Sequence, residues 1–90
     1  MKLSWDENKR QKVLLERGLD MADVPQIFAR TNFTDQDSRI DYGEVRQVTT
    51  GFLNDRLCVV VWTLREAVYH IMSLRKANDR EKGHFKKRVD

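Results

Sequence analysis

The segment that most constrains the fold is the apolar run Cys58–Trp62, with the sequence CVVVW, inside a predicted strand Arg56–Thr63. β-Branched residues favour extended backbone. A run without alternating polar positions is typical of a central strand whose two faces are both covered. The run is much shorter than the roughly 20 residues of a membrane-spanning helix. It therefore predicts a sheet with packed layers on both sides.

Two further strands are predicted beside this one, at Glu44–Thr50 and Val68–Ser73. The links between the three strands are short enough for hairpins, so they form an antiparallel meander. The polar segment Thr31–Gly43 is either a loop or a short edge strand around Phe33. These features predict one α+β domain over residues 1–90, with an antiparallel sheet of three to four strands.

Three helices are predicted around the sheet. The first covers Asp6–Arg17, with either Ser4 and Glu7 as a capping box or Asp6 as the cap, and Gly18 ends it. The second covers Asp20–Arg30, or begins at Asp23 because Pro25 is tolerated only in a first turn. The third covers Asp79–Lys87, and Asn78 with Glu81 has the spacing of a capping box.

The charge is distributed unevenly along the chain. The net charge is +3, but residues 74–90 hold seven Lys or Arg and three acids, which gives +4 there and −1 elsewhere. A basic end suggests an anionic partner, either nucleic acid or an acidic protein, although a solvated helix face explains it equally well. The N-terminus has no apolar signal segment, so a cytoplasmic location is expected.

Metal and thiol chemistry have little support in the sequence. One cysteine and two histidines cannot form a zinc cluster, and Cys58 among valines is expected to be a buried apolar residue. Asp35, Asp37 and Asp41 have a spacing that is similar to part of a calcium loop. The glycine and glutamate that such a loop requires are missing, so no metal and no cofactor are expected.

Five segments, in order, resemble the BrnT toxins of bacterial type II toxin–antitoxin systems: WDENKR, RGLD, DYGEVR, LCVVVWTLR and IMSLRKANDRE. The resemblance runs from Trp5 to about Phe85. It implies a RelE-like fold and a ribonuclease that cleaves mRNA and inhibits translation. It also implies a hetero-oligomer with a BrnA-type antitoxin, through which alone the toxin reaches operator DNA. The chain departs from the family pattern at Arg17 and His70, which bears on catalysis rather than on the fold.

Metal-free RNA cleavage needs a base for the 2′-OH and cations for the phosphate. Arg65 and Arg75 match the most regular positions of the family pattern and are predicted as catalytic, with His70 as either a catalytic or a core residue. The predicted RNA-binding residues are Lys76, Arg80 and Arg46. Cations and backbone N–H groups at the start of the last helix also favour an anion there.

Several alternatives stay open. Arg46 could instead pair with Glu44 or Asp41, and Tyr42 could stack on a base or only close a turn. Trp62 and Tyr69 are expected in the core rather than as stacking surfaces. The whole chain could also be an inactive partner-binding module that acts in operon repression, or a nonspecific nucleic-acid binder.

Overall fold

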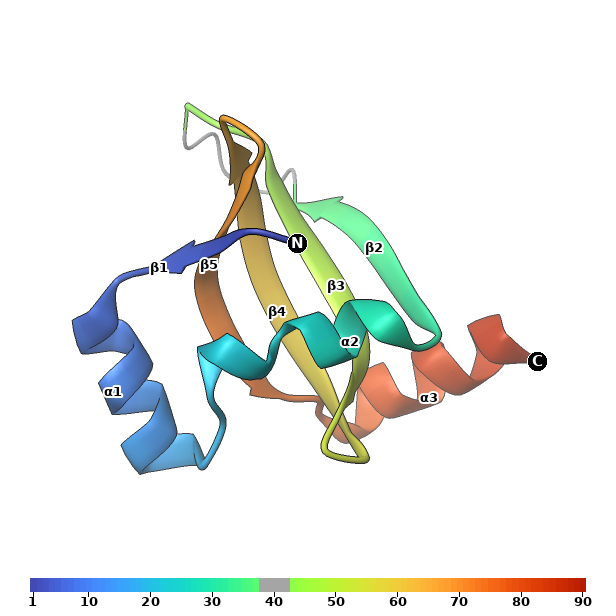
Figure 1. Cartoon of the computed structure of the whole chain (residues 1–90). Coiled ribbons are helices and arrows are strands. Elements are labelled where there is room, and N and C mark those ends of the chain that lie inside the picture. Colours follow the sequence, from blue (N-terminus) through green and yellow to red (C-terminus); the bar gives the residue numbers. More distant parts are fainter. Residues whose placement is uncertain (38–42) are drawn as a thin grey trace.

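The computed structural model describes residues 1–37 and 43–90, and within them a five-stranded sheet carries helices on both faces (Figure 1). The expected α+β class is confirmed. In chain order the elements are β1 (Leu3–Trp5), α1 (Glu7–Arg17), the 3₁₀ turn η1 (Met21–Asp23), α2 (Pro25–Ala29), β2 (Asn32–Asp37), β3 (Arg46–Leu53), β4 (Arg56–Arg65), β5 (Val68–Lys76) and α3 (Asp79–Val89). The strand order is β1-β5-β4-β3-β2. None of the helices within residues 1–37 and 43–90 has the length and apolar composition of a membrane-spanning segment.

The central strand is β4, as its apolar run predicts. Cys58 and Val60 belong to the core cluster that includes Met21, Val24 and Ile27 of the N-terminal segment. Leu57 and Val59, which alternate with Cys58 and Val60, pack on the opposite face with Phe85 of α3. Burial on both faces therefore explains why the run has no polar alternation.

The expected number of strands, three to four and all antiparallel, is wrong. The sheet has five strands in the described residues, and β1 runs parallel to β5, with Leu3 opposite Tyr69. A three-residue strand is too short to show a period in the sequence, and its partner lies more than sixty residues away. The polar segment around Phe33 forms the edge strand β2, as one of the two alternatives predicts.

Helix ends follow the capping signals closely. Asp6, rather than Ser4, caps α1 by accepting hydrogen bonds from the backbone N–H groups of Asn8 and Lys9, and Gly18 ends it with a φ of 67°. Pro25 opens α2, so the predicted long second helix is divided into a 3₁₀ turn and a short helix. The capping box of Asn78 and Glu81 is present at the start of α3.

A β-bulge in the β4–β5 pair changes which side chains share a face. Ile71 lies opposite Trp62, whereas Ser73 lies opposite Val61, so Met72 is the extra residue. Adjacent residues of β4 point to opposite faces, and Ile71 and Ser73 therefore do so too. Without the bulge, strict alternation along β5 would place Ile71 and Ser73 on the same face.

The face that carries α3 is covered only in part. In Figure 1, α3 lies near the lower end of the sheet, where the β3–β4 hairpin turns, and the β4–β5 hairpin lies at the upper end. The β4–β5 turn has positive φ at both Glu66 and Ala67, 49° and 67°. α3 therefore does not cover the part of this face that lies next to the β4–β5 hairpin.

Candidate functional site

Polar side chains gather on the α3-bearing face beside the β4–β5 hairpin. Ile71 is buried against the N-terminal helices, so its neighbour His70 points to the other face. His70 lies opposite Thr63, which places Arg65, two residues along β4, on this face as well. We call Ser4, Glu44, Arg46, Arg65 and His70 the hairpin cluster.

Arg65 is held by a carboxylate from the segment before β3. Its Nε and Nη2 donate to the two carboxylate oxygens of Glu44 at 3.1 and 2.8 Å. The hydrogen bonds from Arg65 lower the pKa of Glu44, and Arg46 and His70 lower it further. The Arg65 side chain is 49% exposed, and this pairing uses two of its five N–H donors. The fixed guanidinium can therefore still donate to a phosphate.

His70 is half-buried and is hydrogen-bonded through Nδ1 to the hydroxyl of Ser4, at 2.8 Å. Burial is the main cause that lowers the pKa of His70, and the charge of Arg65 lowers it further, so both favour the neutral ring. If Nδ1–H donates to the Ser4 oxygen, Nε2 has a free lone pair and can accept a proton. The arrangement is that of a positioned base beside an arginine.

Arg75 has a different environment. Its two terminal nitrogens each donate to one carboxylate oxygen of Glu81, both at 2.7 Å. These bonds lower the pKa of Glu81 to about 2. Glu81 also accepts a hydrogen bond from the backbone N–H of Asn78, and Oδ1 of Asn78 accepts one from the backbone N–H of Glu81. The anion expected at the start of α3 is thus matched by the protein's own carboxylate.

A small pocket of about 340 Å³ lies between α3 and the sheet. Arg80, His84 and Arg88, spaced four residues apart on α3, line it together with Phe33 and Val48 among others. Arg88 bonds to Asp35 at 2.9 Å and lies 4.4 Å above the ring of Phe33. Sequence reasoning missed the place of His84, although its spacing from Arg80 and Arg88 was a usable signal.

Lys76 lies apart from the other predicted site residues. It is opposite Cys58, a member of the core under the N-terminal helices, whereas Arg75 is opposite Val59 on the α3 side. Lys76 lines a second and larger groove at the end of the sheet. The predicted RNA-binding residues are therefore distributed over three places.

Arg65 and Arg75 cannot contact one phosphate. Val59, the partner of Arg75, is six residues from Arg65 along β4, which corresponds to roughly 20 Å of extended strand. The structure brings together Arg65, His70 and Arg46, and it adds Ser4 and Glu44 to them. Sequence reasoning missed the contact between Ser4 and His70, because it considered Ser4 only as one of two candidate caps of the first helix.

The remaining expectations concern metals and the core. In residues 1–37 and 43–90, no group of three His, Cys, Asp or Glu side chains could hold a metal ion. Asp41 and Tyr42 lie outside the described residues, so the interpretations that involve them have no structural counterpart here. Cys58 is buried, and burial raises the pKa of its thiol. Trp62 and Tyr69 pack on each other and on Phe28, as expected of core residues.

One family model matches most of the chain. A family described as "Ribonuclease toxin, BrnT, of type II toxin-antitoxin system" matches residues 5–81. No curated protein matches the chain. The family match runs from the last residue of β1 to the first turn of α3, and it covers every member of the hairpin cluster except Ser4. The chain belongs to the BrnT family of ribonuclease toxins of type II toxin–antitoxin systems.

Proposed function

We propose that this protein cleaves mRNA in the cytoplasm without a metal ion and so inhibits translation, and that a BrnA-type antitoxin neutralises it. The observation that carries the proposal is the contact between neutral His70 and Ser4, beside an arginine held by Glu44. Family membership supports ribonuclease chemistry, and the hairpin cluster offers groups for it.

In this mechanism His70 is the general base. Its Nε2 takes the proton of a ribose 2′-OH while Nδ1–H donates to Ser4. The 2′-oxygen forms a bond to the adjacent phosphorus, and the bond from phosphorus to the 5′-oxygen breaks. Water protonates the leaving oxygen in this open site. The products are a 2′,3′-cyclic phosphate and a 5′-hydroxyl.

Arg65 stabilises the charge that develops on the phosphate. Because Glu44 holds its Nε and Nη2, the guanidinium keeps one orientation and pays little ordering cost when the phosphate arrives. Arg46 adds positive charge on the same face, and Arg80 with His84 extends the contact to flanking nucleotides at the small pocket. Arg75 has a positioning role, because its terminal nitrogens anchor α3 through Glu81.

The test is cleavage of a defined RNA in the presence of EDTA, with product ends identified by mass. We expect wild type to cleave, and His70→Ala or Arg65→Gln to lose roughly 10²–10³-fold in rate. Arg56→Gln is the matched control, since Arg56 is an exposed arginine at the other end of the same strand. Cleavage that requires a divalent ion, or full activity in both cluster variants, would contradict the mechanism.

One observation favours the alternative of an inactive module for antitoxin-mediated repression. Arg65, Arg75 and Arg88 are each paired with a carboxylate, which reduces the positive field available to RNA. On this alternative the chain reaches operator DNA only through the antitoxin. It predicts no cleavage by wild type even when ribosomes are supplied, together with normal antitoxin binding.

A further inference from the structure

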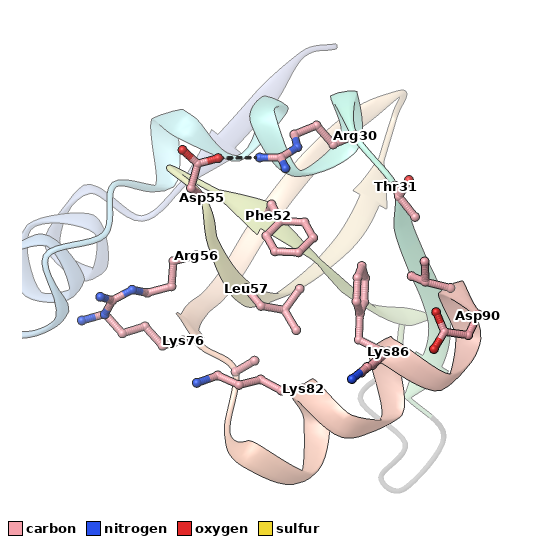
Figure 2. Close-up of a pocket in the computed structure, with 13 residues that line it drawn as sticks. Arg30, Thr31, Phe52, Asp55, Arg56, Leu57, Lys76, Lys82, Lys86 and Asp90 are labelled. Carbon is pink, nitrogen blue, oxygen red and sulfur yellow. Dashed lines mark hydrogen bonds and ion pairs between the residues drawn. The ribbon is translucent and has the colours of Figure 1, made fainter.

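A large open groove lies beside α3 (Figure 2). Its volume is about 1110 Å³, and the β3–β4 hairpin and the end of β5 form its other walls. Lys82 and Lys86 of α3 line this groove, whereas Arg80 and His84 line the small pocket. The two hollows therefore use different sides of one helix, and the mechanism proposed above does not need the larger one.

The groove is strongly basic, and much of its charge is not neutralised. It is lined by Arg30, Arg56, Lys76, Lys82 and Lys86, against two carboxylates, Asp55 and Asp90. Arg30 bonds to Asp55 at 3.0 Å, and Lys82 lies 3.9 Å from Asp79.

Three of these cations have no ion pair within residues 1–37 and 43–90: Arg56, Lys76 and Lys86. This contrasts with Arg65 and Arg88, whose charges are already paired with carboxylates. Like charges gathered in one hollow without counter-charges favour an anionic partner.

The groove is also lined by apolar side chains. Leu57 and Phe85 form part of it, and Val89 is 54% exposed at its rim. The ring of Phe52 is covered by the guanidinium of Arg30, 4.7 Å from its centroid, and it makes a T-shaped contact with Phe85, which is 8% exposed. Little free ring surface remains for stacking nucleobases, which is the usual apolar contact of single-stranded RNA.

We infer that this groove binds an acidic amphipathic helix of the antitoxin. The inference rests on the antitoxin partner of the proposed function. A helix with one apolar stripe between rows of Asp and Glu would place that stripe on the exposed Val89 and its carboxylates on Arg56, Lys76 and Lys86. The groove lies at the opposite end of the sheet from the β4–β5 hairpin and His70. Antitoxin affinity and RNA cleavage therefore depend on different residues.

The test uses two double charge reversals that change the net charge equally. Arg56→Glu with Lys86→Glu alters the groove, whereas Lys12→Glu with Lys87→Glu alters exposed lysines that line neither hollow. The probe is the purified protein encoded by the small gene next to the toxin gene. It is titrated into each toxin variant by calorimetry at two salt concentrations. We expect the groove variant to bind it roughly 100-fold more weakly and the control less than threefold more weakly. Both variants should cleave RNA at the wild-type rate, which also shows that they are folded.

Equal antitoxin affinity in the two variants would overturn the inference, and so would the absence of binding to wild type. A groove variant that loses RNA affinity but keeps its antitoxin affinity would show that the groove binds RNA instead. If wild type fails to cleave RNA while only the groove variant loses the antitoxin, the docking site stands and the ribonuclease proposal fails. Melting temperature then replaces cleavage as the measure of folding.

Discussion

Glu81 is predicted to be the main electrostatic support of α3. Its carboxylate binds both terminal nitrogens of Arg75 and also the backbone N–H of Asn78. The pKa of Glu81 falls from 4.5 to about 2, which corresponds to about 3 kcal/mol at most. Its side chain is 28% exposed, so solvent screening reduces this to roughly 2 kcal/mol. We expect Glu81→Gln to lower the free energy of unfolding by that amount at pH 7.

The pH dependence tests the cause of this loss. Because the pKa of Glu81 is depressed in the folded state, its contribution is complete above the ordinary value of 4.5 and is lost as the pH falls toward about 2. The difference between wild type and Glu81→Gln in urea unfolding should therefore shrink by about half between pH 7 and pH 3. The glutamine can still accept the backbone bond from Asn78, so the capping box does not account for the change.

Asp79→Asn is the matched control, since it removes one charge from the same first turn. Asp79 is fully exposed and lies 3.9 Å from Lys82, so the variant should differ little from wild type at any pH. The reasoning is refuted if Glu81→Gln is as stable as wild type at pH 7, or if its deficit stays constant down to pH 3. Either result would mean that the pair with Arg75 does not stabilise α3.

Three other substitutions test the site and the backbone. Ser4→Ala removes the partner of His70 Nδ1, and we expect about tenfold slower cleavage; an unchanged rate would exclude a positioning role for Ser4. Because the pKa of His70 is lowered, the acidic limb of the wild-type pH–rate profile should lie below 6.5. Ala67→Gly should raise the free energy of unfolding by about 0.5–1 kcal/mol in urea titrations, because Ala67 has a φ of 67°. Gly51→Ala should lower the free energy of unfolding by about 1–3 kcal/mol, because a Cβ there would lie 2.8 Å from Cγ2 of Ile27. An unchanged free energy of unfolding would show that α2 can shift.

Local signals in the sequence predicted the elements whose ends depend on nearby residues. The cap by Asp6, the left-handed Gly18 and the box of Asn78 with Glu81 each need only a few neighbouring positions, and all three are present. The central position of Cys58–Trp62 followed from its lack of polar alternation. These features are short-range, so one sequence is enough to predict them.

The contacts within the hairpin cluster depend on pairing between residues far apart in the chain, which the sequence did not predict. Ser4 meets His70 only because β1 adds to the edge of β5 in parallel register, and Glu44 meets Arg65 across a separation of 21 residues. The bulge at Met72 also breaks the alternation rule. The sequence therefore identified residue types suited to RNA cleavage but could not predict which of them share a site.

The distribution of ion pairs has a consequence for how the two partners bind. A phosphate that approaches Arg65 meets a cation whose charge Glu44 already balances, so few counterions are released. A carboxylate-rich helix that approaches Arg56 and Lys86 displaces counterions from unpaired charges. RNA affinity should thus depend weakly on salt, well below a slope of about 0.7 per phosphate contact, and antitoxin affinity steeply. Added salt should therefore weaken antitoxin binding more than RNA binding, and neutralisation of the toxin should be most complete at low ionic strength.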